Sequence, residues 1–242
     1  MKCNQIDTIT KAQETLHDEI TSVAKKNGFN LNKLAPIYDG VSDIEAYLKS
    51  SPKIMWILKE PYDGFDEKGN PLDGGYVLME DLKDKRDTPL KSMPSTIQRV
   101  IYATYGIFTE YEYDDMWHYS KPEMYKYLFQ IAYVNLSKMP AYPTSGDMTS
   151  KYYMWREIVL KQVELFKPDV IIFGGTFQYI KDDLEIDETN RIHTEDNWKL
   201  NIYKHNNKLY IDTYHPGVRR SPRTYVNMIA NSIKEFKKQI NI

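Results

Sequence analysis

The sequence predicts an α/β protein, a three-layer α/β/α sandwich with a central four-stranded parallel sheet. Four short apolar runs have the length of strands that are buried on both faces, and segments of helical periodicity separate them. Strands that alternate with helices in this way are typical of a parallel sheet covered on both sides. The predicted strands occupy residues 54–58, 131–135, 170–173 and 209–213.

Helices are predicted from the spacing of apolar residues and from boundary signals. In the first 28 residues, apolar side chains three or four positions apart, such as Leu16 and Ile20, define one helical face. A short helix over residues 42–48, with Ser42 as its N-cap, leads into the first strand. Further helices are expected at residues 95–105, 121–130, 150–166 and 221–238.

Three other segments have sequence features that predict their conformation. Residues 60–88 are rich in Gly, Asp and Lys without a sustained period, which predicts a loop that faces the substrate. Gly174 and Gly175 follow the third strand and permit a tight turn into a short helix. Residues 198–204 indicate an antiparallel or irregular stretch before the fourth strand.

Length and composition limit the classes of protein. With 242 residues, 41% hydrophobic and 27% charged, the chain fits one ordinary globular domain over residues 1–242, with residues 1–50 as a helical extension packed on it. The single cysteine, Cys3, excludes an internal disulfide and a four-cysteine cluster. No apolar run approaches the roughly 20 residues of a membrane span, and the N-terminus lacks the apolar stretch of a signal peptide, so we expect a cytoplasmic protein. We also expect a monomer.

Polar side chains follow the predicted strands at the point where each strand ends. Glu60 comes after the first strand, Asn135 ends the second and His215 follows the fourth. Because the carboxyl ends of parallel strands share one edge of a sheet, we expect these three side chains to line a single cleft. A carboxylate can activate a water, an amide can recognise a heterocyclic edge, and an imidazole can stabilise developing negative charge. The set suits cleavage of a bond to a nucleobase.

In these residues the chain resembles the uracil-DNA glycosylase superfamily. The family's first motif is Gly, a variable residue, then Asp, Asn or Ala, then Pro and in one branch Tyr, and residues 58–62 (Leu-Lys-Glu-Pro-Tyr) are similar to it, with Leu58 at the Gly position and Glu60 one methylene longer than Asp. Residues 215–218 (His-Pro-Gly-Val) resemble its second motif, a His-Pro pair followed by a small residue and an apolar wedge. Asn135 falls between the two motifs, where the family places the Asn that reads uracil.

The resemblance implies a role for each of these residues. Glu60 would orient the attacking water and support the sugar cation, and His215 would stabilise the departing base. Tyr62 would close the pocket against a 5-methyl group, and Asn135 would read the pyrimidine. The aromatic or apolar side chain that stacks on the base would be Tyr76 or Leu78.

The resemblance also implies DNA as the partner and a modified base as the substrate, with no metal and no cofactor. The family flips its base out of the stack, and Val218 is the candidate wedge. Because the net charge is −2, affinity for DNA must come from a local basic patch. Arg219, Arg220 and Arg223 form that patch beside the N-terminus of the last predicted helix, which itself attracts anions.

Two functions follow as alternatives. The first is a DNA glycosylase-like enzyme of DNA repair that hydrolyses the N-glycosidic bond of uracil or another modified base in DNA. The second is a non-catalytic protein that keeps the glycosylase fold and binds a nucleobase or a nucleic acid. Each residue also has a plainer interpretation, since Glu60 can pair with a surface cation, Asn135 can bond a turn, His215 can simply end a strand, and the arginines can form a solvated surface.

Overall fold

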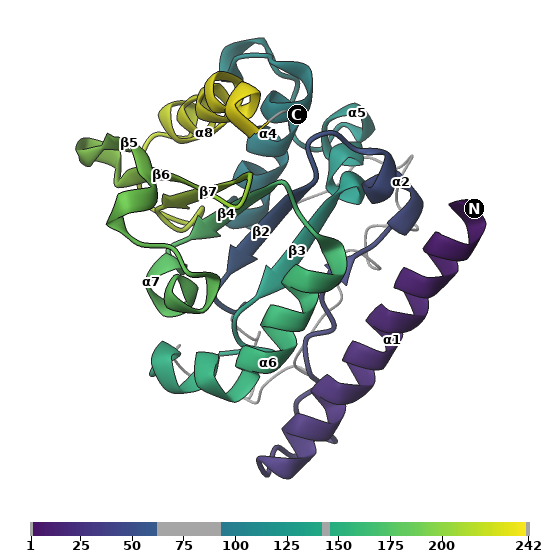
Figure 1. The fold of residues 1–242 in the computed structure, drawn as a ribbon. Coiled ribbons are helices and arrows are strands. Elements are labelled where there is room, and N and C mark those ends of the chain that lie inside the picture. The colour runs from purple at the N-terminus through teal and green to yellow at the C-terminus, as the bar shows by residue number, and fades with distance from the viewer. Residues whose placement is uncertain (1, 62–92, 142–145, 241–242) are drawn as a thin grey trace, which may run out of the picture.

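In the computed structural model, a mixed seven-stranded sheet lies between two sets of helices, and the three layers are seen in Figure 1. The structure describes residues 2–61, 93–141 and 146–240. In this part of the chain the strands stand in the order β1-β3-β2-β4-β7-β6-β5. Their bounds are β1 Gly40–Val41, β2 Ile54–Leu58, β3 Ile131–Asn135, β4 Val170–Gly174, β5 Arg191–Glu195, β6 Leu200–His205 and β7 Lys208–Thr213.

The predicted α/β class is confirmed, and each of the four predicted strands forms. β3, β2, β4 and β7 are neighbours and run parallel. The predicted size of the sheet is wrong, because three more strands extend it. β1 pairs antiparallel with β3 on one side, and on the other side β6 pairs antiparallel with β7 and β5 pairs antiparallel with β6. β1 has only two residues, and β5 is an edge strand whose side chains are exposed or half-buried, so neither carries the apolar run of a central strand.

The helices follow the predicted pattern with shifted ends. They are α1 Lys2–Lys26, α2 Ile44–Lys49, α4 Ser95–Thr109, α5 Pro122–Tyr125, α6 Met148–Phe166, α7 Phe177–Ile180 and α8 Pro222–Phe236. The predicted cap of α2 is wrong by one residue, since Asp43, not Ser42, accepts the hydrogen bond from the Ala46 backbone N–H. A 3-10 turn, Lys126–Gln130, replaces the second half of the helix expected at residues 121–130.

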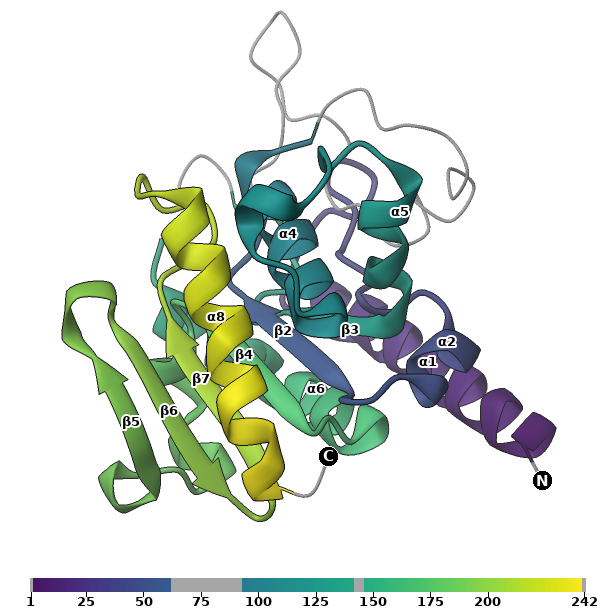
Figure 2. The same ribbon diagram turned by 90° about the horizontal axis from the view of Figure 1, so that it is seen from above.

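Two apolar cores lie on opposite faces of the sheet, and successive side chains of β2 point into one core and then the other. Trp56 points into the core beneath α4, α5 and α8, whereas Met55 and Ile57 point into the core beneath α1, α6 and α7. Figure 2 shows α4 and α8 on one side of the strands and α6 on the other. None of the described helices combines the length and the apolar character that a membrane span needs.

Candidate functional site

A glycine pair brings the ends of β2 and β7 together across the end of β4. A side chain at Gly174 would clash with Leu58 of β2 and Pro216 of the loop after β7, so only glycine fits there. The Gly175 N–H donates to the Thr213 carbonyl oxygen at 2.8 Å, and the Thr176 hydroxyl donates to the Ile57 carbonyl oxygen at 2.7 Å. These hydrogen bonds therefore attach two segments, the backbone before Glu60 and the backbone before His215, to the same turn after β4.

Glu60 is a buried carboxylate that pairs with Lys151. Its side chain is 1% exposed, and Nζ of Lys151, in the first turn of α6, lies 3.0 Å from Oε1. The other oxygen, Oε2, is buried without a hydrogen-bond partner among the described residues. Burial raises the pKa of Glu60, and the hydrogen bond and charge of Lys151, with a smaller effect from Lys59, act in the opposite direction.

His215 is held as a neutral imidazole in one tautomer. Burial lowers its pKa to about 4, and the positive charge of Lys59 contributes to the same shift. The Gly217 backbone N–H lies 3.1 Å from Nδ1, which must therefore act as the acceptor. The ring proton of neutral His215 consequently resides on Nε2, which makes this atom a hydrogen-bond donor at neutral pH.

Hydrogen bonds from α4 hold the loop that contains His215 in place. The buried guanidinium of Arg99 donates to the carbonyl oxygens of Pro216, Val218 and Arg220. On the other side, the Tyr225 hydroxyl of α8 donates to the Tyr214 carbonyl oxygen at 2.9 Å. Hydrogen bonds between a charged donor and backbone carbonyls are strong. The position of His215 is thus set by α4 and α8 as well as by its own strand.

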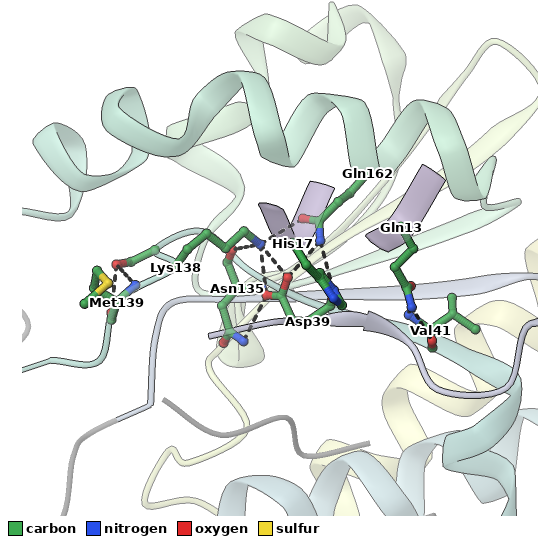
Figure 3. A network of polar contacts seen from close by, with 9 residues as sticks. Gln13, His17, Asp39, Val41, Asn135, Lys138, Met139 and Gln162 are labelled. Carbon is green, nitrogen blue, oxygen red and sulfur yellow. Dashed lines mark hydrogen bonds and ion pairs between the residues drawn. The ribbon is translucent and has the colours of Figure 1, made fainter. Parts of the chain in front are cut away.

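Asn135 belongs to a buried polar network centred on Asp39, in which Asn135, Lys138 and Gln162 converge on its carboxylate (Figure 3). Lys138 Nζ, fully buried, lies 2.7 and 2.9 Å from the two carboxylate oxygens. Burial lowers the pKa of Lys138, and Asp39 opposes that shift. The Asn135 amide nitrogen lies 3.2 Å from Asp39 Oδ2. Because a carboxylate only accepts, one amide hydrogen of Asn135 is committed to Asp39.

The segments that follow β2 and β3 run side by side beyond the sheet. The Leu136 N–H donates to the Leu58 carbonyl oxygen at 2.8 Å, and the Ala141 N–H donates to the Pro61 carbonyl oxygen at 2.9 Å. Glu60 and Asn135 therefore lie on neighbouring segments at one edge of the sheet. That they line one cleft with His215 stays a prediction. A groove of about 840 Å³ between α1 and the C-terminal half of α6, near Ile9 and Lys161, is a separate feature.

The arginines of the predicted DNA-binding patch differ in their surroundings. Arg220 lies over the rings of Trp198 and Tyr214, at 5.3 and 4.6 Å from their centroids, and donates to the Asn197 carbonyl oxygen. Arg223 forms an exposed ion pair with Asp114 at 2.8 Å. Arg219 is exposed and has no ion pair with a described residue. Val218, the predicted wedge, is half-buried against the core under α4 and α8.

Three predicted substrate-binding residues, Tyr62, Tyr76 and Leu78, lie outside the described residues, as does most of the predicted substrate-facing loop. Among the residues that are described, no group of three His, Cys, Asp or Glu side chains is arranged to hold a metal ion. No known family model matches this chain, and no curated protein matches it.

Sequence reasoning missed Asp39, Arg99, Lys138 and Lys151. No motif surrounds Asp39 or Lys138, because their pairing depends on a contact 99 residues apart in sequence. For Lys151, by contrast, the predicted topology indicates a position near Glu60. A helix that follows a parallel strand starts at the strand's carboxyl edge, so the first turn of α6 has to lie near the end of the sheet where Glu60 lies.

We expect that Lys138→Met lowers the free energy of unfolding by about 3–5 kcal/mol, because it leaves the Asp39 carboxylate buried without its counter-ion. Urea unfolding measures this loss. The control is Lys161→Met on the same helix as Gln162, where the exposed pair with Glu19 contributes about 0–1 kcal/mol. The double variant Asp39→Asn, Lys138→Met should recover part of the loss. Equal stability of Lys138→Met and the wild type would contradict this account.

A second prediction concerns the pH dependence of stability. The pKa of His215 is about 4 in the folded protein against an ordinary value of 6.5, so between these values the unfolded chain binds a proton that the folded chain does not. Stability must therefore fall as the pH falls through this window. We expect His215→Gln to lose less stability than the wild type between about pH 7 and about pH 5 in urea unfolding. His118→Gln, on an exposed loop, should behave like the wild type.

Proposed function

We propose that this chain is a divergent member of the uracil-DNA glycosylase superfamily that hydrolyses the N-glycosidic bond of uracil or another modified base in DNA, as a step of DNA repair. The observation that carries the proposal is the placement of Glu60 and His215 after parallel strands whose ends share one edge of the sheet. A buried carboxylate and a neutral imidazole with its proton on Nε2 follow strands β2 and β7 at the same edge of the sheet. The order of the layers and the four parallel strands are compatible with this superfamily.

The proposed reaction uses both groups in one displacement. The oxygen of a water forms a bond to the anomeric carbon of the deoxyribose while the bond from that carbon to the base nitrogen breaks. The electron pair of the broken bond goes to the base, and one proton of the water goes to the Glu60 carboxylate. The Nε2–H of His215 donates a hydrogen bond to the oxygen of the base on which negative charge develops. The products are an abasic sugar and the anion of the base, which becomes the free base when it takes up a proton from the solvent, while Glu60 returns its proton to the solvent.

Two contacts are equally consistent with the alternative, a non-catalytic protein that binds a nucleobase or a nucleic acid. Lys151 partly neutralises Glu60, which weakens the carboxylate as a base. Asp39 takes one amide hydrogen of Asn135, so any contact of Asn135 with a heterocycle must use its remaining groups. Neither contact requires that a bond be cleaved.

One experiment separates the two functions. The protein is incubated with oligonucleotides that each carry one modified base, and abasic sites are then cleaved with alkali. We expect strand cleavage at one of these bases, with a loss of about 10²–10⁴ in turnover for Glu60→Gln and about 10²–10³ for His215→Ala. Binding without cleavage would favour the non-catalytic alternative, and absence of both would contradict the proposal.

DNA binding has its own test, and Arg219 is the residue to change because it has no ion pair with a described residue. Arg219→Ala should weaken binding regardless of sequence and reduce the slope of log affinity against log salt by about 0.9 for duplex or about 0.7 for single strands, if one phosphate contact is lost. Fluorescence anisotropy at several salt concentrations measures this slope. Arg191→Ala, on the edge strand β5, is the control: it removes the same charge at a distant place, together with an exposed ion pair to Glu188. An unchanged slope for Arg219→Ala would exclude Arg219 from the DNA interface.

A further inference from the structure

The two oxygens of the Glu60 carboxylate are not equivalent. Lys151 holds Oε1 at 3.0 Å, while Oε2 is buried and has no partner among the described residues. An unpaired buried acceptor is expensive, because it has given up its hydrogen bonds to water. Such an atom in a native structure needs an explanation, and a bound water, an ion and a catalytic role are among those known.

The contact with Lys151 also limits how the carboxylate can turn. Rotation that turned the carboxylate away from Lys151 would break a charge-assisted hydrogen bond in a site where the Glu60 side chain is 1% exposed. Asp147 caps α6 through the Thr149 N–H, so the turn that carries Lys151 is itself fixed. The helix thus presents the ammonium group to one side of the carboxylate.

We propose that Lys151 is the positioning residue of the reaction: it holds Oε1 of Glu60 so that Oε2 accepts the hydrogen bond of the attacking water and then its proton. This inference rests on the proposed function, and it adds a residue that is absent from the motifs of the sequence. Lys151 itself contacts neither the substrate nor the reacting atoms.

The ammonium group also controls the charge of Glu60. Burial raises the pKa of this carboxyl, and Lys151, ahead of Lys59, opposes the rise. On the β7 side, His215 is neutral above about pH 4 and contributes no further charge there. Without Lys151 the pKa of Glu60 must move upward, so the acid limb of the pH–rate profile, where Glu60 loses its negative charge, must move to higher pH.

Lys151→Met tests this inference, and Lys161→Met on the exposed part of the same helix is the matched control. With a uracil-containing oligonucleotide as the probe, we expect Lys151→Met to lower kcat/KM by about 10–10² near pH 6, which is the scale of a misplaced catalytic group. The loss should shrink as the pH rises through the acid limb. Lys151→Arg should restore most of the activity, because it retains a cation with hydrogen-bond donors.

A second readout does not depend on activity. The titration of Glu60 is followed by carbon-13 NMR of glutamate-labelled protein, and Glu60→Gln assigns the signal. We expect the midpoint to rise in Lys151→Met, to return toward the wild-type value in Lys151→Arg, and to stay unchanged in Lys161→Met. If Lys151→Met does not fold, Lys151→Gln replaces it, since it also removes the charge.

Each outcome decides a different point. An unchanged midpoint in Lys151→Met overturns the inference. A raised midpoint with unchanged activity in an active protein overturns the role of Lys151 in the reaction. A wild type that cleaves no modified base overturns the proposed function, and in that case a raised midpoint in Lys151→Met still supports the control of Glu60 by Lys151.

Discussion

The buried ion pair between Asp39 and Lys138 organises the side of the sheet on which Asn135 lies. It joins the segment before β1 to the turn after β3, and hydrogen bonds of Gln162 connect both groups to the C-terminal half of α6. Removing two charges from water costs several kcal/mol per ion, and the cost is offset only when hydrogen bonds satisfy both groups. This network satisfies them, since the amides of Asn135 and Gln162 donate to the carboxylate and the ammonium also donates to the Asn135 carbonyl oxygen. The conformation at the end of β3 is therefore fixed by electrostatics as much as by apolar packing.

A second buried cation fixes the opposite side of the site by a different route. Arg99 donates to three backbone carbonyls of the His215 loop. These contacts need no particular side chains in the loop, so they position the backbone whatever the loop sequence presents to a ligand. Between the two sides, Gly174 permits the close approach of Leu58 and Pro216. The carboxylate and the imidazole are thus carried by backbone that is held at several points, which is the condition for catalytic geometry.

The sequence allowed the central strands to be predicted, because a strand buried on both faces is an uninterrupted apolar run such as residues 54–58. It also allowed the prediction that polar residues meet at the strand ends, since topology alone brings Glu60 and Asn135 to one edge. It did not reveal β1, which is too short to have a period, or β5, whose exposed edge carries no apolar run. The partners Asp39 and Lys151 were hidden for another reason: a charged residue on a surface and one in a buried network are the same letter in a sequence, and only the fold distinguishes them.

The charged groups at the site affect whether the base in the proposed reaction leaves as an anion or takes up a proton. Two ammonium groups, Lys59 and Lys151, act on the single carboxylate of Glu60, and Lys59 also contributes to the low pKa of His215, about 4. An imidazole with this pKa donates a hydrogen bond from Nε2 but gives no proton to the base, so negative charge stays on the base as the bond breaks. A positive charge near His215 repels the imidazolium cation and so lowers the pKa of His215. The same charge attracts the anion of the leaving base and so stabilises it. Lys59, at the variable position of the motif that the chain resembles, therefore contributes to the proposed chemistry through the electrostatic potential of the site.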